Sequence, residues 1–217
     1  MKKIFFLGLV VGLVLSLASP AQAANLVANP GFETWGPWGP GGSEAAGNWW
    51  GMFSDPNVTG TKESVIKKSG SFSGKTAFAG TAGAWGGWGQ RVPFTAGNTL
   101  YAYQPVNIPT ALGGTNSLAT LEIAFESAPD VTIGSAVKTS TSAATGGWGD
   151  IQYSAVAPVG TTSLRYVVLL ETWGSGTGAA YFDDAYADSV PIPEPASMLL
   201  LGSGLVGLFG ITRKKKS

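Results

Sequence analysis

Three glutamates in the second half of the chain carry side chains suited to catalysis. Glu122, Glu126 and Glu171 could include the acid and base of a glycosidase, because paired carboxylates hydrolyse glycosides without histidine. The chain contains no His and no Cys, which excludes catalytic triads and His- or Cys-based zinc sites. Glu122 and Glu126 lie four residues apart on one strand face, roughly 13 Å, which exceeds the ~9.5 Å upper separation of an inverting pair. No spacing therefore identifies a catalytic pair.

Tryptophan is the second chemical signal. Seven of the eight Trp are followed directly by Gly, which removes the neighbouring side chain and lets a flat indole lie exposed on a loop. Sugar rings stack on such indoles through their apolar C–H surfaces. The alternative is core packing, which is usual for a Trp that opens a strand, as Trp148 does. The predicted sugar-binding platform consists of Trp35, Trp38, Trp49, Trp50, Trp85 and Trp88, with Trp173 in a second loop.

Short runs with a period of two predict a body made of β-strands. Clusters of Gly, Pro, Asn and Ser separate the runs at the spacing of an all-β sandwich or barrel. Alternation in the run 121–126 predicts one buried face and one solvent-facing face, and the apolar run 163–171 predicts a central strand. Further strands are expected at 64–68, 90–94, 99–106, 151–155 and 179–187, with turns at 95–98 and 158–163.

The first residues have the form of a secretory signal. Lys2 and Lys3 precede an apolar stretch at 4–17, and Ala21-Gln22-Ala23 is a small-x-small cleavage site. We therefore expect signal peptidase to remove residues 1–23, so that the mature chain begins at Ala24. An uncleaved N-terminal anchor is the alternative.

A second apolar segment, at 196–212, lies near the end of the chain. As a helix its apolar residues 196–211 would span roughly 24 Å, slightly less than the ~30 Å hydrocarbon core, so we expect a transmembrane helix. The basic tail at 213–217 would stop transfer and remain on the cytoplasmic side.

The motif Pro193-Glu194-Pro195 stands directly before this segment. A residue that precedes proline is pushed out of the α region, so Glu194 should be extended. The motif, the apolar segment and the basic tail at 190–217 resemble the PEP-CTERM sorting signal of bacterial exported proteins. The resemblance implies cleavage by a membrane exosortase, with the body first held at the outer face of the cytoplasmic membrane and later at the cell surface or in the extracellular matrix. A C-terminal anchor without processing is the alternative.

The body between the two ends, at 24–189, is one domain's length. Its seven Lys and Arg and twelve Asp and Glu give a formal charge of −5. We therefore expect no nucleic-acid partner. Because there is no Cys, stability must come from packing or from a metal, although the compartment would permit disulfides.

Three stretches of the body share a resemblance. "NLVANPGFE" at Asn25–Glu33, "GQRVPFTAGNTLYAY" at 89–103 and the segment 157–187 are together similar to a carbohydrate-binding module with the galactose-binding-like β-jelly-roll fold. Members of this fold often hold a structural Ca²⁺ where the first and last strands meet, which implies Glu33 and Asp183 or Asp184 as ligands. The adjacent charges of Asp183 and Asp184 also favour a nearby cation. Solvated acids at strand ends are the alternative.

These observations lead to three hypotheses. The first is an exported, noncatalytic module that binds extracellular polysaccharide. The second is a structural or adhesive matrix protein, in which the same tryptophans mediate protein contacts. The third is a carboxylate-dependent glycosidase.

Overall fold

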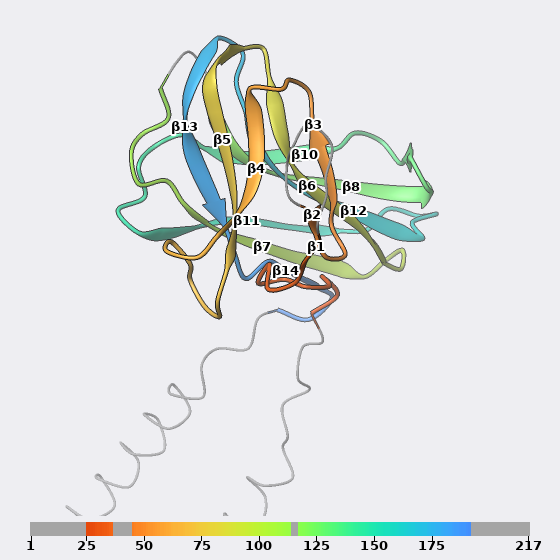
Figure 1. Ribbon diagram of the computed structural model, residues 1–217. Coiled ribbons are helices and arrows are strands. Elements are labelled where there is room, and N and C mark those ends of the chain that lie inside the picture. Colours follow the sequence, from red (N-terminus) through yellow and green to blue (C-terminus); the bar gives the residue numbers. More distant parts are fainter. Residues whose placement is uncertain (1–24, 37–44, 114–116, 192–217) are drawn as a thin grey trace, which may run out of the picture. The chain divides into compact units, whose positions relative to one another are not determined.

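Antiparallel strands account for all the regular structure in the part of the chain that the structure describes. The computed structural model describes residues 25–36, 45–113 and 117–191, and within it Asn25–Val190 is one compact unit. Its strands form two six-stranded sheets, which pack face to face as a β-sandwich (Figure 1). The predicted all-β sandwich is confirmed.

The first sheet, called the β12 sheet, has the order β10-β8-β12-β6-β3, with β9 paired to β8. The apolar run 163–171 is strand β12, at the centre of this sheet between β8 and β6, as its sequence predicts. The strands are β3 (Trp50–Phe53), β6 (Trp85–Pro93), β8 (Leu118–Ala128), β9 (Val131–Thr132), β10 (Val137–Thr141) and β12 (Ser163–Glu171).

The second sheet, called the β7 sheet, has the order β11-β7-β13-β5-β4, with β14 paired to β7. A separate short pair joins β1 (Trp35–Gly36) to β2 (Ala45–Ala46). The strands of the β7 sheet are β4 (Val58–Glu63), β5 (Ser73–Ala82), β7 (Thr99–Asn107), β11 (Trp148–Val156), β13 (Ser175–Phe182) and β14 (Tyr186–Asp188).

Alternate residues of the two sheets fill the space between them. Leu164, Val168 and Leu170 of β12 are buried, as are the inward residues of β7. One polar connection crosses this core: the Tyr166 hydroxyl donates to the backbone oxygen of Tyr103 at 2.9 Å and contacts Gln104 Oε1 at 3.0 Å. Because a buried hydroxyl needs a partner, this contact helps to fix how one sheet lies on the other.

Aromatic rings fill one region of the core. Phe32 stacks on Trp49 at a centroid distance of 4.8 Å, and Trp88 meets Phe32 edge-on at 5.5 Å. Glycines make the necessary room: a Cβ on Gly60 or on Gly86 would lie 2.3 or 2.4 Å from the Phe53 ring. The Trp-Gly steps therefore serve partly to pack the core.

Two of the expected strands are wrong in detail. Residues 64–68 form a loop, because the Glu63 carboxylate accepts from the amides of Ser64 and Val65. The expected strand 179–187 is interrupted between β13 and β14, where Asp184 has a φ of 46°. In both places side chains or unusual backbone angles replace ladder pairing.

The chain begins and ends the unit at the same place. The Leu26 amide donates to the Ala187 oxygen at 2.8 Å, and the Asn25 side chain donates to the Ala185 oxygen at 2.7 Å. The first described segment therefore lies beside the last (Figure 1).

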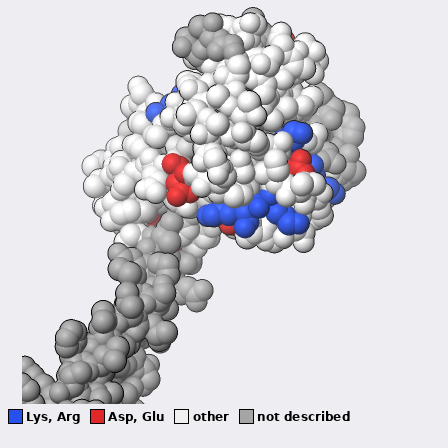
Figure 2. Space-filling model, turned by 90° about the vertical axis from the view of Figure 1, so that its left-hand side faces the viewer, with Lys and Arg blue, Asp and Glu red and all other residues white. Residues whose placement is uncertain are grey.

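The charged side chains are few and gather in groups. On the side of the molecule shown in Figure 2, much of the surface is uncharged, and Lys and Arg side chains form a band across the lower part of the domain. A second group, of both signs, lies on the β12 sheet and belongs to the site described next.

Candidate functional site

The outer face of the β12 sheet gathers residues from four neighbouring strands. Glu122 of β8 is paired with Val167 of β12 and with Lys138 of β10. Arg165 of β12 is paired with Arg91 of β6. Because alternate residues of a strand share a face, this register places separated charged residues of the sequence on one surface.

Two hollows open on this face. The first, the Trp85 hollow, has a volume of about 390 Å³. The second, the Trp50 hollow, has a volume of about 340 Å³ and is lined by Trp50, Met52, Arg91, Asp130 and Arg165. Met52 and Arg165 line both hollows, so the two adjoin and are together called the groove. The residues around the Trp85 hollow are Met52, Gly83, Trp85, Glu122, Lys138, Arg165, Val167, Leu169, Glu171 and Trp173.

Three exposed tryptophans border the groove. Trp50, Trp85 and Trp173 are 37%, 41% and 69% exposed. The Trp50 indole lies over Gly89, where a Cβ would come within 2.9 Å of the ring. Gly89 thus lets this indole lie close against the sheet while part of it stays exposed.

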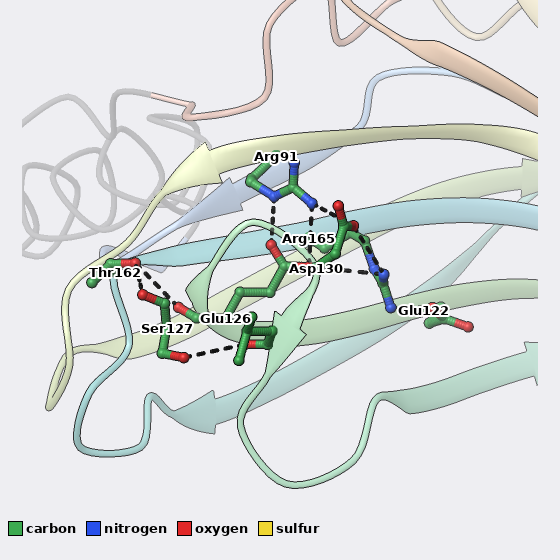
Figure 3. Close-up of polar contacts among 8 residues, drawn as sticks. Arg91, Glu122, Glu126, Ser127, Asp130, Thr162 and Arg165 are labelled. Carbon is green, nitrogen blue, oxygen red and sulfur yellow. Dashed lines mark hydrogen bonds and ion pairs between the residues drawn. The ribbon is translucent and has the colours of Figure 1, made fainter.

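Charged side chains form a connected network along the groove. Arg91 Nε donates to Glu126, which is fully buried, and Arg91 Nη2 donates to Asp130 at 2.9 Å. Arg165 continues the network through contacts to Glu122 and Asp130 at 3.4 and 4.0 Å (Figure 3). The hydrogen bond to Glu126 raises the pKa of Arg91 above its usual value, so this group stays cationic.

All three glutamates singled out by the sequence lie in this network. Glu171 accepts from Thr120 Oγ1 at 2.8 Å and from Lys138 Nζ at 2.6 Å. Glu126 was expected on a solvent-facing side and is instead completely buried, because Arg91 covers and neutralises it. The structure brings these carboxylates together, each beside a cation.

The structure divides the predicted tryptophan platform between two places. Trp50, Trp85 and Trp173 reach the groove, whereas Trp88 is fully buried and Trp49 is almost so. Trp35 is half-buried, with its ring 6.0 Å from that of Trp88. Trp35, Trp49 and Trp88 are therefore removed from the exposed platform, because they pack the aromatic core. Trp38 lies outside the described residues.

The acids predicted to bind calcium also lie together, around Gly31. A Cβ on Gly31 would be 3.5 Å from Asp183 Oδ1 and 3.6 Å from atoms of Asp184 and Glu33. This agrees with the meeting of the first and last segments that the sequence resemblance implies.

The oxygens of these acids are engaged by the loop 68–72. Asp183 Oδ2 accepts from the amides of Lys68 and Ser69 at 2.7 and 3.2 Å, and Glu33 Oε1 accepts from the Ser71 amide at 2.9 Å. Within the described ranges, no group of three or more acids is arranged to hold a metal ion. Calcium binding would require these carboxylates to turn, and it stays a prediction.

Burial raises the pKa of Asp183 to about 6, against an ordinary value of 3.8. The amides of Lys68 and Ser69 act in the opposite direction, because they stabilise the ionised carboxylate.

Sequence reasoning missed the cations and the thioether of the groove. Arg91, Lys138, Arg165 and Met52 were not singled out, nor was Asp130. Alternation within each strand could have assigned faces, but only the register between strands shows that these side chains meet.

The predicted processing sites lie outside the described residues. These are the signal cleavage site at Ala21, Ala23 and Ala24, the motif Pro193-Glu194-Pro195 and the segment 196–212. Among the residues that are described, no helix is long and apolar enough to cross a membrane.

Comparison with known families identifies the C-terminal motif. Residues 191–214 match the PEP-CTERM protein-sorting motif. This motif indicates a protein that is exported and processed by an exosortase, in agreement with the expectation from the sequence. No curated protein matches the chain.

Solved structures share the fold. TmCBM61, determined in complex with β-1,4-galactotriose, is 17% identical, with a TM-score of 0.52, and the match covers 76% of this chain and 98% of that one. The enzymatically active domain of tailspike protein 4 from bacteriophage CBA120 is 12% identical with a TM-score of 0.54, covering 76% and 21%. The arabinose-bound MgGH51 α-L-arabinofuranosidase is 13% identical with a TM-score of 0.54, covering 79% and 27%. The chain thus spans nearly all of the module but only about a fifth to a quarter of the two larger proteins.

Proposed function

We propose that the body of this exported protein binds an extracellular polysaccharide in the groove of the β12 sheet and does not cleave it. The observation that carries the proposal is the presence of three exposed tryptophans, Trp50, Trp85 and Trp173, around one open groove. Trp50 and Trp85 belong to strands and Trp173 to the loop after β12, and their exposed indoles offer flat apolar surfaces to sugar rings at little cost in side-chain entropy.

The length of the groove favours a chain of sugars over a single sugar. Trp50 is paired with Gly89, four residues along β6 from Trp85. At the rise of a β-strand these positions are roughly 13 Å apart, which is longer than one pyranose ring. Several consecutive units could therefore contact the two indoles at once.

The contacts of the glutamates favour binding over hydrolysis. A glycosidase needs a carboxyl group that can reach the leaving oxygen of the bound sugar and donate a proton to it. Glu126 is completely buried beneath Arg91, and Glu122 and Glu171 are each engaged by Lys138. Glu122 and Glu171 line the groove, where their carboxylates can accept hydrogen bonds from sugar hydroxyls.

Calorimetric titration of the full chain, purified in detergent, against a panel of soluble polysaccharides tests the proposal. We expect at least one ligand to bind, and the double variant Trp85→Ala/Trp173→Ala to bind it at least tenfold more weakly. Trp148→Ala, on the other sheet, is the matched control and should bind normally. Unchanged binding in the double variant would contradict the proposal. Concentration-dependent assembly without any sugar binding would instead favour the structural or adhesive function.

For its route to the cell surface, we propose removal of 1–23 by signal peptidase and membrane retention through 196–212 until exosortase acts. Mass spectrometry of the protein from its native source should show an N-terminus at Ala24 and a C-terminus near 193–195. Recovery of chains that end at Ser217 would indicate a permanent anchor.

A further inference from the structure

The Trp50 hollow differs from the rest of the groove in the charge of its walls. Its charged lining consists of Arg91, Arg165 and Asp130, two cations against one anion. The Trp85 hollow is lined by Glu122, Glu171, Lys138 and Arg165, in which the charges cancel. One end of the groove is therefore suited to an anionic group and the other to a neutral one.

Both guanidinium groups are held in place. Arg91 is fixed by Glu126 from beneath, and its guanidinium carbon lies 5.7 Å from the Trp50 ring centroid. Arg165 is held by Glu122 and Glu126, at 3.4 and 3.8 Å, and its Nε is buried without a hydrogen-bond partner among the described residues. A guanidinium binds a carboxylate through two parallel N–H donors, and a preorganised one loses little freedom in doing so.

Asp130 occupies the space between the two arginines (Figure 3). Its side chain is 79% exposed and belongs to the turn between β8 and β9. An ion pair with so exposed a partner contributes little to stability, so another carboxylate could displace it. Once Asp130 has moved away, Arg91 and Arg165 keep Glu126 and Glu122 as partners, and the N–H donors that Asp130 occupied become free to face the hollow.

We propose that the Trp50 hollow binds the carboxylate of a uronic acid residue in the polysaccharide. The sugar ring stacks on Trp50, and its carboxylate takes the place of Asp130 between Arg91 and Arg165. Neutral sugar rings of the same chain lie in the Trp85 hollow. The inference rests on the proposed function, because it names the class of glycan that the groove selects.

Titration of the full chain in detergent with short uronate oligosaccharides tests this. The probes are trisaccharides of galacturonate, glucuronate and mannuronate, each compared with its methyl ester, which keeps the ring and removes the charge. We expect at least one free acid to bind tenfold or more tightly than its ester, with a preference that weakens as salt is added. Arg91→Gln, combined with Glu126→Gln so that no unpaired charge stays buried, should reduce the ratio of acid to ester affinity to about one.

The variant Asp130→Asn gives the more stringent test, because it should tighten the binding of the free acid. Asn tolerates the left-handed backbone of this turn, where φ is 62°, so the variant should fold normally. We expect it to bind the free acid several-fold more tightly and to raise the ratio of acid to ester affinity. Equal affinities for acid and ester, or weaker acid binding in Asp130→Asn, would overturn the inference. If acid and ester bound equally but the binding of neutral oligosaccharides still depended on Trp85 and Trp173, the inference would fail and the proposed function would stand. Loss of all glycan binding would remove both.

Discussion

The inner and outer faces of the β12 sheet use the same Trp-Gly step for opposite purposes. Trp85 and Trp88 lie three residues apart on β6 and therefore point to opposite faces: Trp85 lines the groove, while Trp88 is enclosed by other aromatic rings. In the core, glycines on neighbouring strands make room for the rings, and on the outer face Gly89 lets Trp50 lie against the sheet. The dipeptide alone does not say where its indole goes, because the face is set by strand register.

The largest expected effect tests the burial of Trp88. Trp88→Ala should lower the free energy of unfolding by about 3–5 kcal/mol, because it leaves a large cavity among aromatic rings. Trp85→Ala, on the same strand, should change it by less than about 0.5 kcal/mol. Urea denaturation measures both, and similar losses in the two variants would mean that the two faces are not distinct.

A pair of glycine variants sharpens the same contrast. Gly86→Ala should destabilise the protein by about 1–3 kcal/mol, since its Cβ would press on Phe53 and Val58 in the core. Gly89→Ala should cost less, because the Trp50 indole can move into solvent, but it should weaken glycan binding. A stability loss as large for Gly89→Ala as for Gly86→Ala would contradict this assignment.

The sequence specified the sandwich well and its surface poorly. Strand β12 was predicted to the residue at Ser163–Glu171, because a long apolar run has one natural place in a sheet. The loop at 64–68 was missed, since its amides bind the carboxylates of Glu63 and Asp183, the second of which is 115 residues distant from Lys68. Contacts between residues so far apart in the sequence cannot be detected from the local pattern of apolar and polar residues.

The sequence predicted only those site residues whose type alone suggests sugar binding or catalysis. The exposed tryptophans and the three glutamates stand out by chemistry, but alternation wrongly exposed Glu126. Its burial depends on Arg91, which reaches it from two strands away in the sheet, β6 against β8 with β12 between. A pattern within one strand cannot report such a partner.

A comparison of buried acids extends the contrast between regions. Glu126 faces guanidinium groups, whereas Asp183 faces backbone amides and lies beside Asp184. Burial raises the pKa of Asp183 above its unfolded value, so its contribution to stability is full below about pH 4 and is lost as the pH rises through about 6. In a calcium-free buffer, the melting temperature should therefore fall by a few degrees between these values. Asp183→Asn should flatten that part of the curve, and an equal fall in the variant would exclude Asp183 as its cause.

The smallest expected effect concerns calcium at the same acids. If Glu33, Asp183 and Asp184 turn toward a bound Ca²⁺, millimolar calcium should raise the melting temperature at pH 7 by mass action, and a chelator should reverse the change. Glu33→Gln should remove the response. If neither calcium nor chelator changes the melting temperature, these carboxylates serve only to hold the loop 68–72.

The hydrogen bond from Leu26 to Ala187 holds the two ends of the domain together, so the domain could be transferred to another protein. Because its chain enters and leaves at adjacent points, the sandwich could be inserted into a surface loop of another protein as a complete unit. It could equally be circularly permuted, with its ends joined and a new opening made at the exposed Val159-Gly160 turn. Both operations keep β6, β8 and β12 as neighbours in one sheet, so the groove should be retained.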